Sequence, residues 1–141
     1  MKDMVKRAQS LAAKVHASQK DKGGNPYINH IEGVAAGVES VEAKTVAYLH
    51  DVLEDTATTE DDLKKEGFPA EIIEAVKALT KGKDETYEEF IKRVGENSLA
   101  TKVKLSDLAN NMDISRIPEP TKKDYERIEK YRKAAKYLKN L

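Results

Sequence analysis

The chain contains no cysteine, and this absence excludes disulfide bonds, thiolate zinc sites and iron–sulfur clusters. The only imidazole side chains available as metal ligands are those of His16, His30 and His50. A metal bound by this chain is therefore expected to be held by imidazole and carboxylate groups. That set of donors suits Mn²⁺, Fe²⁺, Zn²⁺ or Mg²⁺.

The chain also lacks an excess of charge of one sign and a long apolar run. Its 25 basic and 25 acidic residues give a formal net charge of zero, so it is not a polycation built for nucleic acid. No apolar run is long enough to span a membrane, and the first residues do not form a secretory signal. We therefore expect a cytoplasmic protein without nucleic-acid or membrane partners, folded as one domain over residues 1–141.

Apolar residues recur at helical spacing along the chain, and no segment shows the convincing alternation of a strand. Glycine, proline and capping residues separate the helical segments. The pattern predicts an all-α bundle of about seven to eight helices. The expected helices cover residues 4–20, 31–38, 43–55, 58–67, 69–82, 86–95, 98–114 and 121–138.

Four groups suited to metal binding or acid–base chemistry fall within six residues: His50, Asp51, Glu54 and Asp55. On a continuous helix over residues 43–55 they occupy one arc of about 140°, opposite the apolar residues. Three neighbouring carboxylates repel one another unless a cation or a hydrogen-bond network offsets the repulsion. The cluster is therefore the first indication of a bound metal.

Two further places could supply ligands. One is His30, which follows a loop at residues 21–26, and the other is Asp107, which shares a helix face with Asn111 four residues later. Each also has an ordinary structural interpretation, because a single helical histidine usually packs or faces solvent and a lone aspartate usually faces water. His16 is expected to make only a local hydrogen bond beside the apolar stripe of its helix.

Together, these residues resemble the ligand set of the HD-domain phosphohydrolases in order and type. Residues 24–30 resemble the motif G-x-P-Y-I-x-H, residues 49–56 resemble L-H-D-x-x-E-D-T, and residues 104–112 resemble K-L-A-D-x-x-x-N-M. His16 and Gln19 match the H-x-x-Q that precedes the first loop. The combination resembles the hydrolase domain of the RelA/SpoT family in its small stand-alone form.

The resemblance implies an HD-domain bundle that removes the 3′-pyrophosphate from the nucleotides guanosine tetraphosphate (ppGpp) and guanosine pentaphosphate. Glu54 and Asp55 would form the acid–base pair, and Asn111 and Lys22 would contact the nucleotide. A chain of 141 residues is too short to carry the family's synthetase domain as well, so hydrolysis alone is expected. The ligands that the resemblance implies for one divalent cation, Mn²⁺ in this family, are His30, His50, Asp51 and Asp107.

One position departs from the family pattern and leaves the substrate open. Two residues after Gln19 the family commonly has an arginine that stacks on the guanine base, and this chain has Asp21. Three hypotheses follow. The first is ppGpp hydrolysis, and the second, favoured by Asp21, is an HD-domain phosphatase for a different nucleotide or phosphate ester. The third is a non-catalytic helical binding module, against which the pair Glu54 and Asp55 argues.

Overall fold

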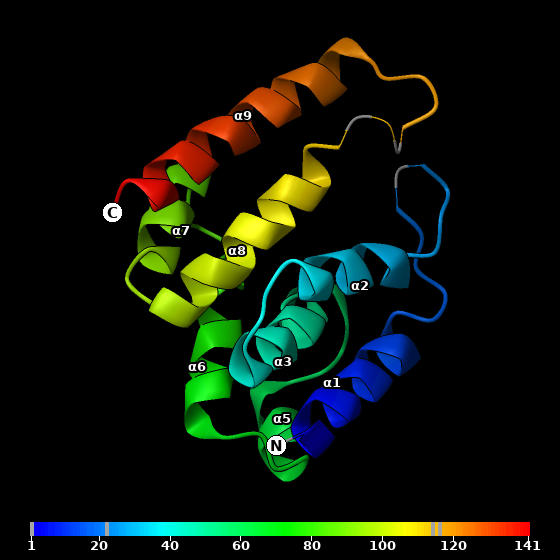
Figure 1. Cartoon of the computed structure of the whole chain (residues 1–141), viewed down its shortest axis with the longest axis vertical. Helices are drawn as coiled ribbons and strands as arrows, with labels where there is room; N and C mark the ends of the chain where they lie inside the picture. The colour runs from blue at the N-terminus through cyan, green and yellow to red at the C-terminus, as the bar shows by residue number, and fades with distance from the viewer. Residues whose placement is uncertain (1, 22, 114, 116) are drawn as a thin grey trace.

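The computed structural model describes residues 2–21, 23–113, 115 and 117–141, and their regular structure is all helix, as predicted (Figure 1). Within these residues the only strand-like feature is an isolated antiparallel bridge between Lys20 and Pro26. None of the helices described is both long and apolar enough to cross a membrane. The helices are α1 (Lys2–Val15), α2 (Ile28–Ala36), α3 (Val41–Leu49), α4 (Val52–Asp55), α5 (Glu60–Lys65), α6 (Ala70–Ala78), α7 (Tyr87–Val94), α8 (Ser98–Asn111) and α9 (Lys122–Lys139).

Two of the predicted helices differ from the structure in ways that affect the polar residues beside them. α1 ends at Val15 rather than near residue 20, because the Gln19 N–H bonds to the carbonyl of His16 and forms a turn there. The helix expected over residues 43–55 is divided into α3 and α4, because Asp51 has φ −107° and ψ 0°, outside the helical range. The arc predicted for a continuous helix is therefore wrong, and the division changes where the polar side chains point.

Capping side chains mark the starts of α5 and α7. The predicted capping box of Thr86 and Glu89 opens α7 and is confirmed. The box before α5 consists of Thr59 and Asp62, one residue later than predicted. A capping box pairs two backbone N–H groups at the first turn of a helix, so these boundaries leave a signal in the local sequence.

α3 lies at the centre of the bundle, with α1, α2, α6 and α8 packed around it, and α9 lies over α7 and α8 at the top of Figure 1. The sequence of α3 suits a central helix because its second half is fully apolar apart from one tyrosine hydroxyl. Val46, Ala47, Tyr48 and Leu49 are all buried. His50 follows directly after this segment and is carried into the interior with it.

Two glycines allow α2 and α8 to approach closely. A Cβ atom on Gly33 would lie 2.4 Å from Asn110 Nδ2, and one on Gly37 would lie 2.2 Å from Ser106 Oγ. A Cβ atom at either position would displace one of these side chains, so glycine leaves the room that Asn110 and Ser106 occupy between the helices. Ser106 Oγ also donates a hydrogen bond to the carbonyl of Val34 at 2.7 Å. The close packing brings the polar faces of α2 and α8 together.

Arg93 in α7 connects the end of α6 to the loop before α7. Its guanidinium donates to both carboxylate oxygens of Glu85, at 2.8 and 2.9 Å, and to the carbonyls of Lys77, Ala78 and Thr80. The last carbonyls of a helix have no partner within the helix, and this side chain supplies one. The hydrogen bonds from Arg93 are also the main reason that the pKa of Glu85 is lowered to about 2.

Replacing Arg93 with lysine is expected to reduce the free energy of unfolding by about 1–2 kcal/mol. The planar guanidinium reaches all these acceptors at once, whereas the smaller ammonium group of lysine cannot. Urea unfolding measures the loss, with the exposed Arg132→Lys as a matched control. The contribution of Glu85 is present above its ordinary pKa of 4.5 and is lost as the pH falls toward 2. The difference between wild type and variant should therefore shrink over that interval, and a difference independent of pH would contradict this role of Glu85.

Candidate functional site

Three of the predicted metal ligands meet in the interior, each from a different segment. His30 lies in α2, His50 directly after α3 and Asp107 in α8, and all three side chains are buried. One ligand atom from each residue lies within 4.8 Å of those from the other two. Asp107 Oδ1 is 2.9 Å from His30 Nε2 and 3.4 Å from His50 Nε2. The fold thus creates a compact group of two imidazoles and one carboxylate.

The hydrogen bonds of the two imidazoles determine which ring nitrogen faces Asp107. His50 Nδ1 lies 2.5 Å from the carbonyl oxygen of Ala47, which can only accept, so Nδ1 carries the proton. His30 Nδ1 donates in the same way to Asn110 Oδ1 at 2.6 Å. The Nε2 atoms therefore face the Asp107 carboxylate: His30 Nε2 lies within hydrogen-bond distance of Asp107 Oδ1, and His50 Nε2 is buried without a hydrogen-bond partner among the described residues.

A cation between these atoms would take the place of the imidazole protons and would be bound by the two Nε2 atoms and the Asp107 carboxylate. Histidines that bind metals usually donate their other ring N–H to a carbonyl or carboxylate, as both do here. Burial opposes protonation of His50, but the carboxylates of Asp51 and Asp107 outweigh it and raise the pKa of His50 well above the ordinary value. The group of His30, His50 and Asp107 therefore fits a divalent metal ion in donor type, tautomer and burial.

Asp51, the fourth predicted ligand, borders this group without belonging to the set of atoms within 4.8 Å. Its Oδ2 lies 3.2 Å from His50 Nε2 and accepts a hydrogen bond from the hydroxyl of Tyr27. Burial and the Asp51 carboxylate raise the pKa of Tyr27, so the phenol stays protonated and remains a donor. Tyr27 therefore orients Asp51, a role that the sequence motif alone did not reveal.

Lys104 holds the second oxygen of Asp107. Its Nζ lies 2.9 Å from Asp107 Oδ2 and 5.2 Å from the centre of the Phe90 ring, and its side chain is largely buried. Burial alone would raise the pKa of Asp107, but Lys104 and the two histidines hold it well below the ordinary value. Asp107 is therefore ionised, with Oδ2 occupied by Lys104 and Oδ1 directed at the imidazoles.

Glu54 and Asp55, the predicted acid–base pair, lie in α4 beside the buried group and are themselves exposed. Partial burial and the nearby Asp51 carboxylate raise the pKa of both. Gln19 Nε2 donates to Asp55 Oδ2 at 3.4 Å, and Gln19 Oε1 accepts from His16 Nδ1 at 2.7 Å. The local hydrogen bond predicted for His16 is thus confirmed, and it orients the amide that reaches Asp55.

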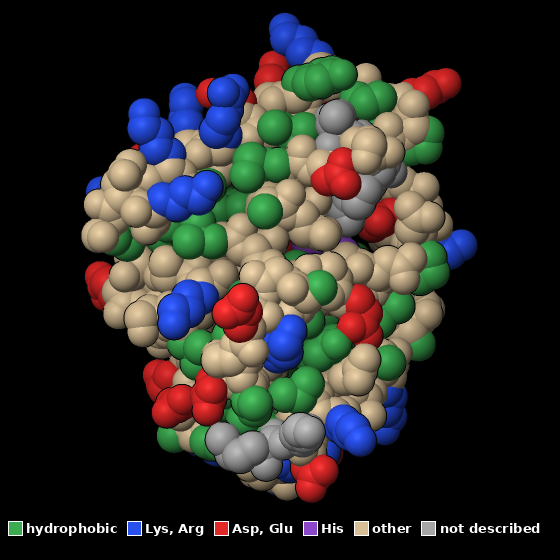
Figure 2. Space-filling model, viewed as in Figure 1, with side chains coloured by type: hydrophobic (Ala, Val, Ile, Leu, Met, Phe, Trp, Pro, Cys, Tyr) green, Lys and Arg blue, Asp and Glu red, His purple; other side chains and the backbone are tan. Residues whose placement is uncertain are grey.

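A hollow of about 300 Å³ lies beside His30. Figure 2 shows a small area of histidine surface inside a narrow opening on the face in view. Asn111 lines the hollow, and its Nδ2 donates to Asp107 Oδ1 at 3.2 Å. Arg127 and Tyr131 of α9 line it as well. Sequence reasoning missed these two residues, because α9 is charged along its length and nothing local indicates which face is covered.

Asp21 shapes the loop that borders the hollow. Its Oδ1 accepts hydrogen bonds from the N–H groups of Gly23 and Asn25, at 2.9 and 3.0 Å. Such a bond from an aspartate to the backbone two residues later stabilises a tight turn. The residue that replaces the family's arginine therefore has a structural role in this chain. Lys22, the other residue predicted to contact substrate, lies outside the described residues.

The model of the HD domain family matches residues 8–135, a range that contains His30, His50 and Asp107 as well as Arg127 and Tyr131 of α9. The chain belongs to the HD-domain family. Among relatives of this HD-domain chain is the Mus musculus protein named guanosine-3′,5′-bis(diphosphate) 3′-pyrophosphohydrolase MESH1. It is 35% identical over 149 aligned positions, which cover 95% of this chain and 82% of the mouse protein.

Longer bacterial proteins also match the HD-domain chain. A protein of Aquifex aeolicus named guanosine-3′,5′-bis(diphosphate) 3′-pyrophosphohydrolase is 35% identical over 120 residues, covering 77% of this chain but only 17% of its own length. A solved structure described as a metazoan orthologue of SpoT that hydrolyses ppGpp superposes with a TM-score of 0.79 at 24% identity, covering 96% of this chain and 84% of that one. The superposition shows that the two share a fold.

Proposed function

We propose that this HD-domain chain is a metal-dependent hydrolase that releases pyrophosphate from the 3′ position of ppGpp. The observation that carries the proposal is the pair of imidazole Nε2 atoms aimed at Asp107 Oδ1 at the edge of a hollow large enough for part of a nucleotide. The name of the mouse relative, which this chain matches over 82% of its length, supports the choice of substrate.

We expect one divalent cation, Mn²⁺, held by His30, His50 and Asp107, with Asp51 as the fourth ligand. When bound, the ion would lower the pKa of a water molecule and neutralise charge on the phosphoryl group. Lys104 would keep Asp107 ionised and its Oδ1 directed at the ion, and Tyr27 would do the same for Asp51.

Glu54 and Asp55 would carry the proton transfers. The oxygen of water forms a bond to the phosphorus attached to the ribose 3′-oxygen, and the bond from that phosphorus to the 3′-oxygen breaks. One carboxylate takes a proton from the water and the other gives a proton to the departing 3′-oxygen, so the products are GDP and pyrophosphate. The raised pKa values of the adjacent pair suit this division, because one group can hold a proton while the other is ionised.

Arg127, Tyr131 and Asn111 would position the nucleotide in the hollow. Arg127 offers a planar set of donors that suits phosphate oxygens, and Tyr131 offers an aromatic face for a base. Position 21 is an aspartate that hydrogen-bonds within its own loop, so no arginine side chain is available there to stack on a guanine base. The contacts from α9 would therefore contribute more to binding of the base.

The direct test compares two reactions of the purified, manganese-loaded protein. We expect pyrophosphate release from ppGpp that stops with EDTA and returns when Mn²⁺ is added back. A panel of nucleoside mono-, di- and triphosphates serves as the control, and little phosphate should be released from it. Efficient phosphate release from that panel without pyrophosphate release from ppGpp would instead establish the second hypothesis, an HD-domain phosphatase for another substrate, which Asp21 favours.

The remaining properties expected from the sequence accompany this proposal. They are a small-molecule nucleotide as substrate, a cytoplasmic location, a single domain over residues 1–141, and no nucleic-acid or membrane partner. Any metal-dependent turnover would exclude the third hypothesis, a non-catalytic binding module.

A further inference from the structure

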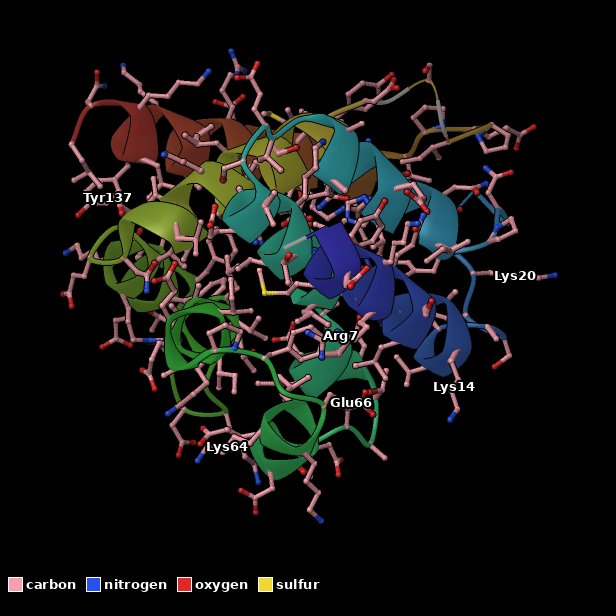
Figure 3. All side chains as sticks on the ribbon, turned by 60° about the horizontal axis from the view of Figure 1, so that its bottom comes forward. Arg7, Lys14, Lys20, Lys64, Glu66 and Tyr137 are labelled. Carbon is pink, nitrogen blue, oxygen red and sulfur yellow. The ribbon has the colours of Figure 1, made fainter. Side chains whose placement is uncertain are left out.

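A second hollow, of about 290 Å³, lies between α7 and α9. Its apolar walls come from Tyr87 and Ile91 of α7 and from Ala134 and Tyr137 of α9. It shares no lining residue with the hollow beside His30. Figure 3 shows the separation, because Tyr137 from this hollow and Lys20 from the other one lie at opposite sides of the molecule.

The spacing of residues on α9 explains why the space stays open. Residues 130, 133, 134 and 137 share one face of the helix and all line the hollow. The buried residue at the centre of this face is Ala134, whose methyl group is too small to fill the space opposite Ile91. The neighbouring Ala135 and Leu138 are buried and anchor α9, so the helix is held in place while the hollow remains.

The rim of this hollow is positively charged. Lys92 of α7 and Lys130 and Lys133 of α9 line it, and Glu88 is the only acidic residue there. None of the three lysines makes an ion pair within the described part of the chain. Figure 2 shows Lys and Arg side chains gathered at the upper left, where Figure 1 places the C-terminal half of α9. Like charges held this close favour an anion between them.

Aromatic and cationic groups are in contact at this site. Lys130 Nζ lies 4.3 Å from the centre of the Tyr87 ring and 5.6 Å from that of Tyr131. Partial burial and the nearby Arg127 and Lys104 lower the pKa of Lys130, an effect that a bound anion would oppose. The Tyr87 hydroxyl is buried without a hydrogen-bond partner among the described residues. A ligand with a flat ring and a phosphate would match the tyrosines and the lysines together.

We propose that this second hollow binds a small phosphorylated compound with a planar ring, of the nucleoside phosphate class. The ring packs against the side chains of Ile91, Ala134, Tyr87 and Tyr137, and the phosphate groups lie among the three lysines. The site does not depend on the metal or on the hydrolytic reaction, so it can be tested independently of the proposed function.

The test uses GDP as the probe and the backbone amide signals of the ¹⁵N-labelled full chain. We expect a saturable shift of the amides of Ile91, Ala134 and Tyr137. The double variant Lys92→Glu with Lys133→Glu should weaken this binding at least about tenfold, the effect of losing roughly 1.4 kcal/mol. The matched control, Lys123→Glu with Lys136→Glu, makes the same charge change on exposed lysines outside the hollow and should bind GDP as wild type does.

A variant without a charge change tests the shape of the hollow. Ala134→Met should fill it and weaken GDP binding, with thermal melting reporting that the fold is intact. Inorganic pyrophosphate should bind at least about tenfold more weakly than GDP, because it lacks the ring. Three results would each overturn the proposal. They are amide shifts confined to the surroundings of His30, equal loss of GDP binding in both double variants, and equal affinity for pyrophosphate and GDP.

Release of pyrophosphate from ppGpp should be unchanged in Lys92→Glu with Lys133→Glu, which separates the two proposals.

Discussion

Replacing His50 with alanine is expected to abolish metal binding and hydrolysis together. His50 supplies one of three ligand atoms that lie within 4.8 Å of one another, and its Nε2 has no other hydrogen-bond partner among the described residues. Loss of a residue that only orients a ligand costs about 10–100-fold in metal affinity, so loss of the ligand itself should cost more than about 100-fold. Titration of the purified protein with Mn²⁺, followed by electron paramagnetic resonance, measures this change.

His16→Ala is the matched control for that experiment. His16 is as deeply buried as His50, at 2% and 3% exposed, but it does not belong to the group of three. The His16→Ala variant should therefore bind the metal with wild-type affinity, although loss of the imidazole frees the Gln19 amide.

Asp51→Ala should also lose metal and activity if Asp51 is the fourth ligand. Full activity in His50→Ala, with an unchanged fold by circular dichroism, would refute the ligand assignment.

Replacing Glu54 with glutamine should leave the metal bound and slow turnover by about 100-fold or more, the usual size of an acid–base contribution. Glu54 is exposed and lies outside the group of His30, His50 and Asp107, so the neutral isostere should remove only the capacity to transfer a proton. The rate constant at saturating ppGpp and the dissociation constant of Mn²⁺ separate these two effects.

Asp61→Asn provides the control for Glu54→Gln, because it removes an exposed carboxylate of α5 that lines neither hollow. Its turnover should equal that of wild type. If Glu54→Gln also kept wild-type turnover, Glu54 would have no part in the proton transfers. If it lost the metal instead, Glu54 would have to be placed among the ligands.

The sequence predicted the residue types at the site better than their arrangement. It identified His30, His50 and Asp107 as candidate ligands, and the structure brings these three together. It placed Asp51 and His50 on one continuous helix, whereas the backbone leaves the helical range at Asp51. The roles of all four in metal binding, and of Glu54 and Asp55 in catalysis, remain predictions.

Residues that support the site were harder to find. Tyr27 hydrogen-bonds to Asp51 and Asn110 to His30, across 24 and 80 positions of the sequence, so nothing in their spacing indicates these contacts. Lys104 lies three residues before Asp107 on the same helix, and helical spacing does indicate that contact. Arg127 and Tyr131 follow the proline-containing segment before α9, and they border the hollow only because α9 folds back over α8.

The amino-acid sequence by itself excluded thiolate ligands, through the absence of cysteine, and determined the helical class, through apolar spacing and capping boxes. These features depend on residues a few positions apart, and short-range hydrogen bonding and side-chain periodicity express them directly. Only the tertiary structure decided that His30 Nε2 lies 2.9 Å from Asp107 Oδ1, 77 positions away in the sequence. That contact forms where α2 packs against α8, with Gly33 and Gly37 leaving room there for Asn110 and Ser106, and it is a property of packed surfaces rather than of either segment alone.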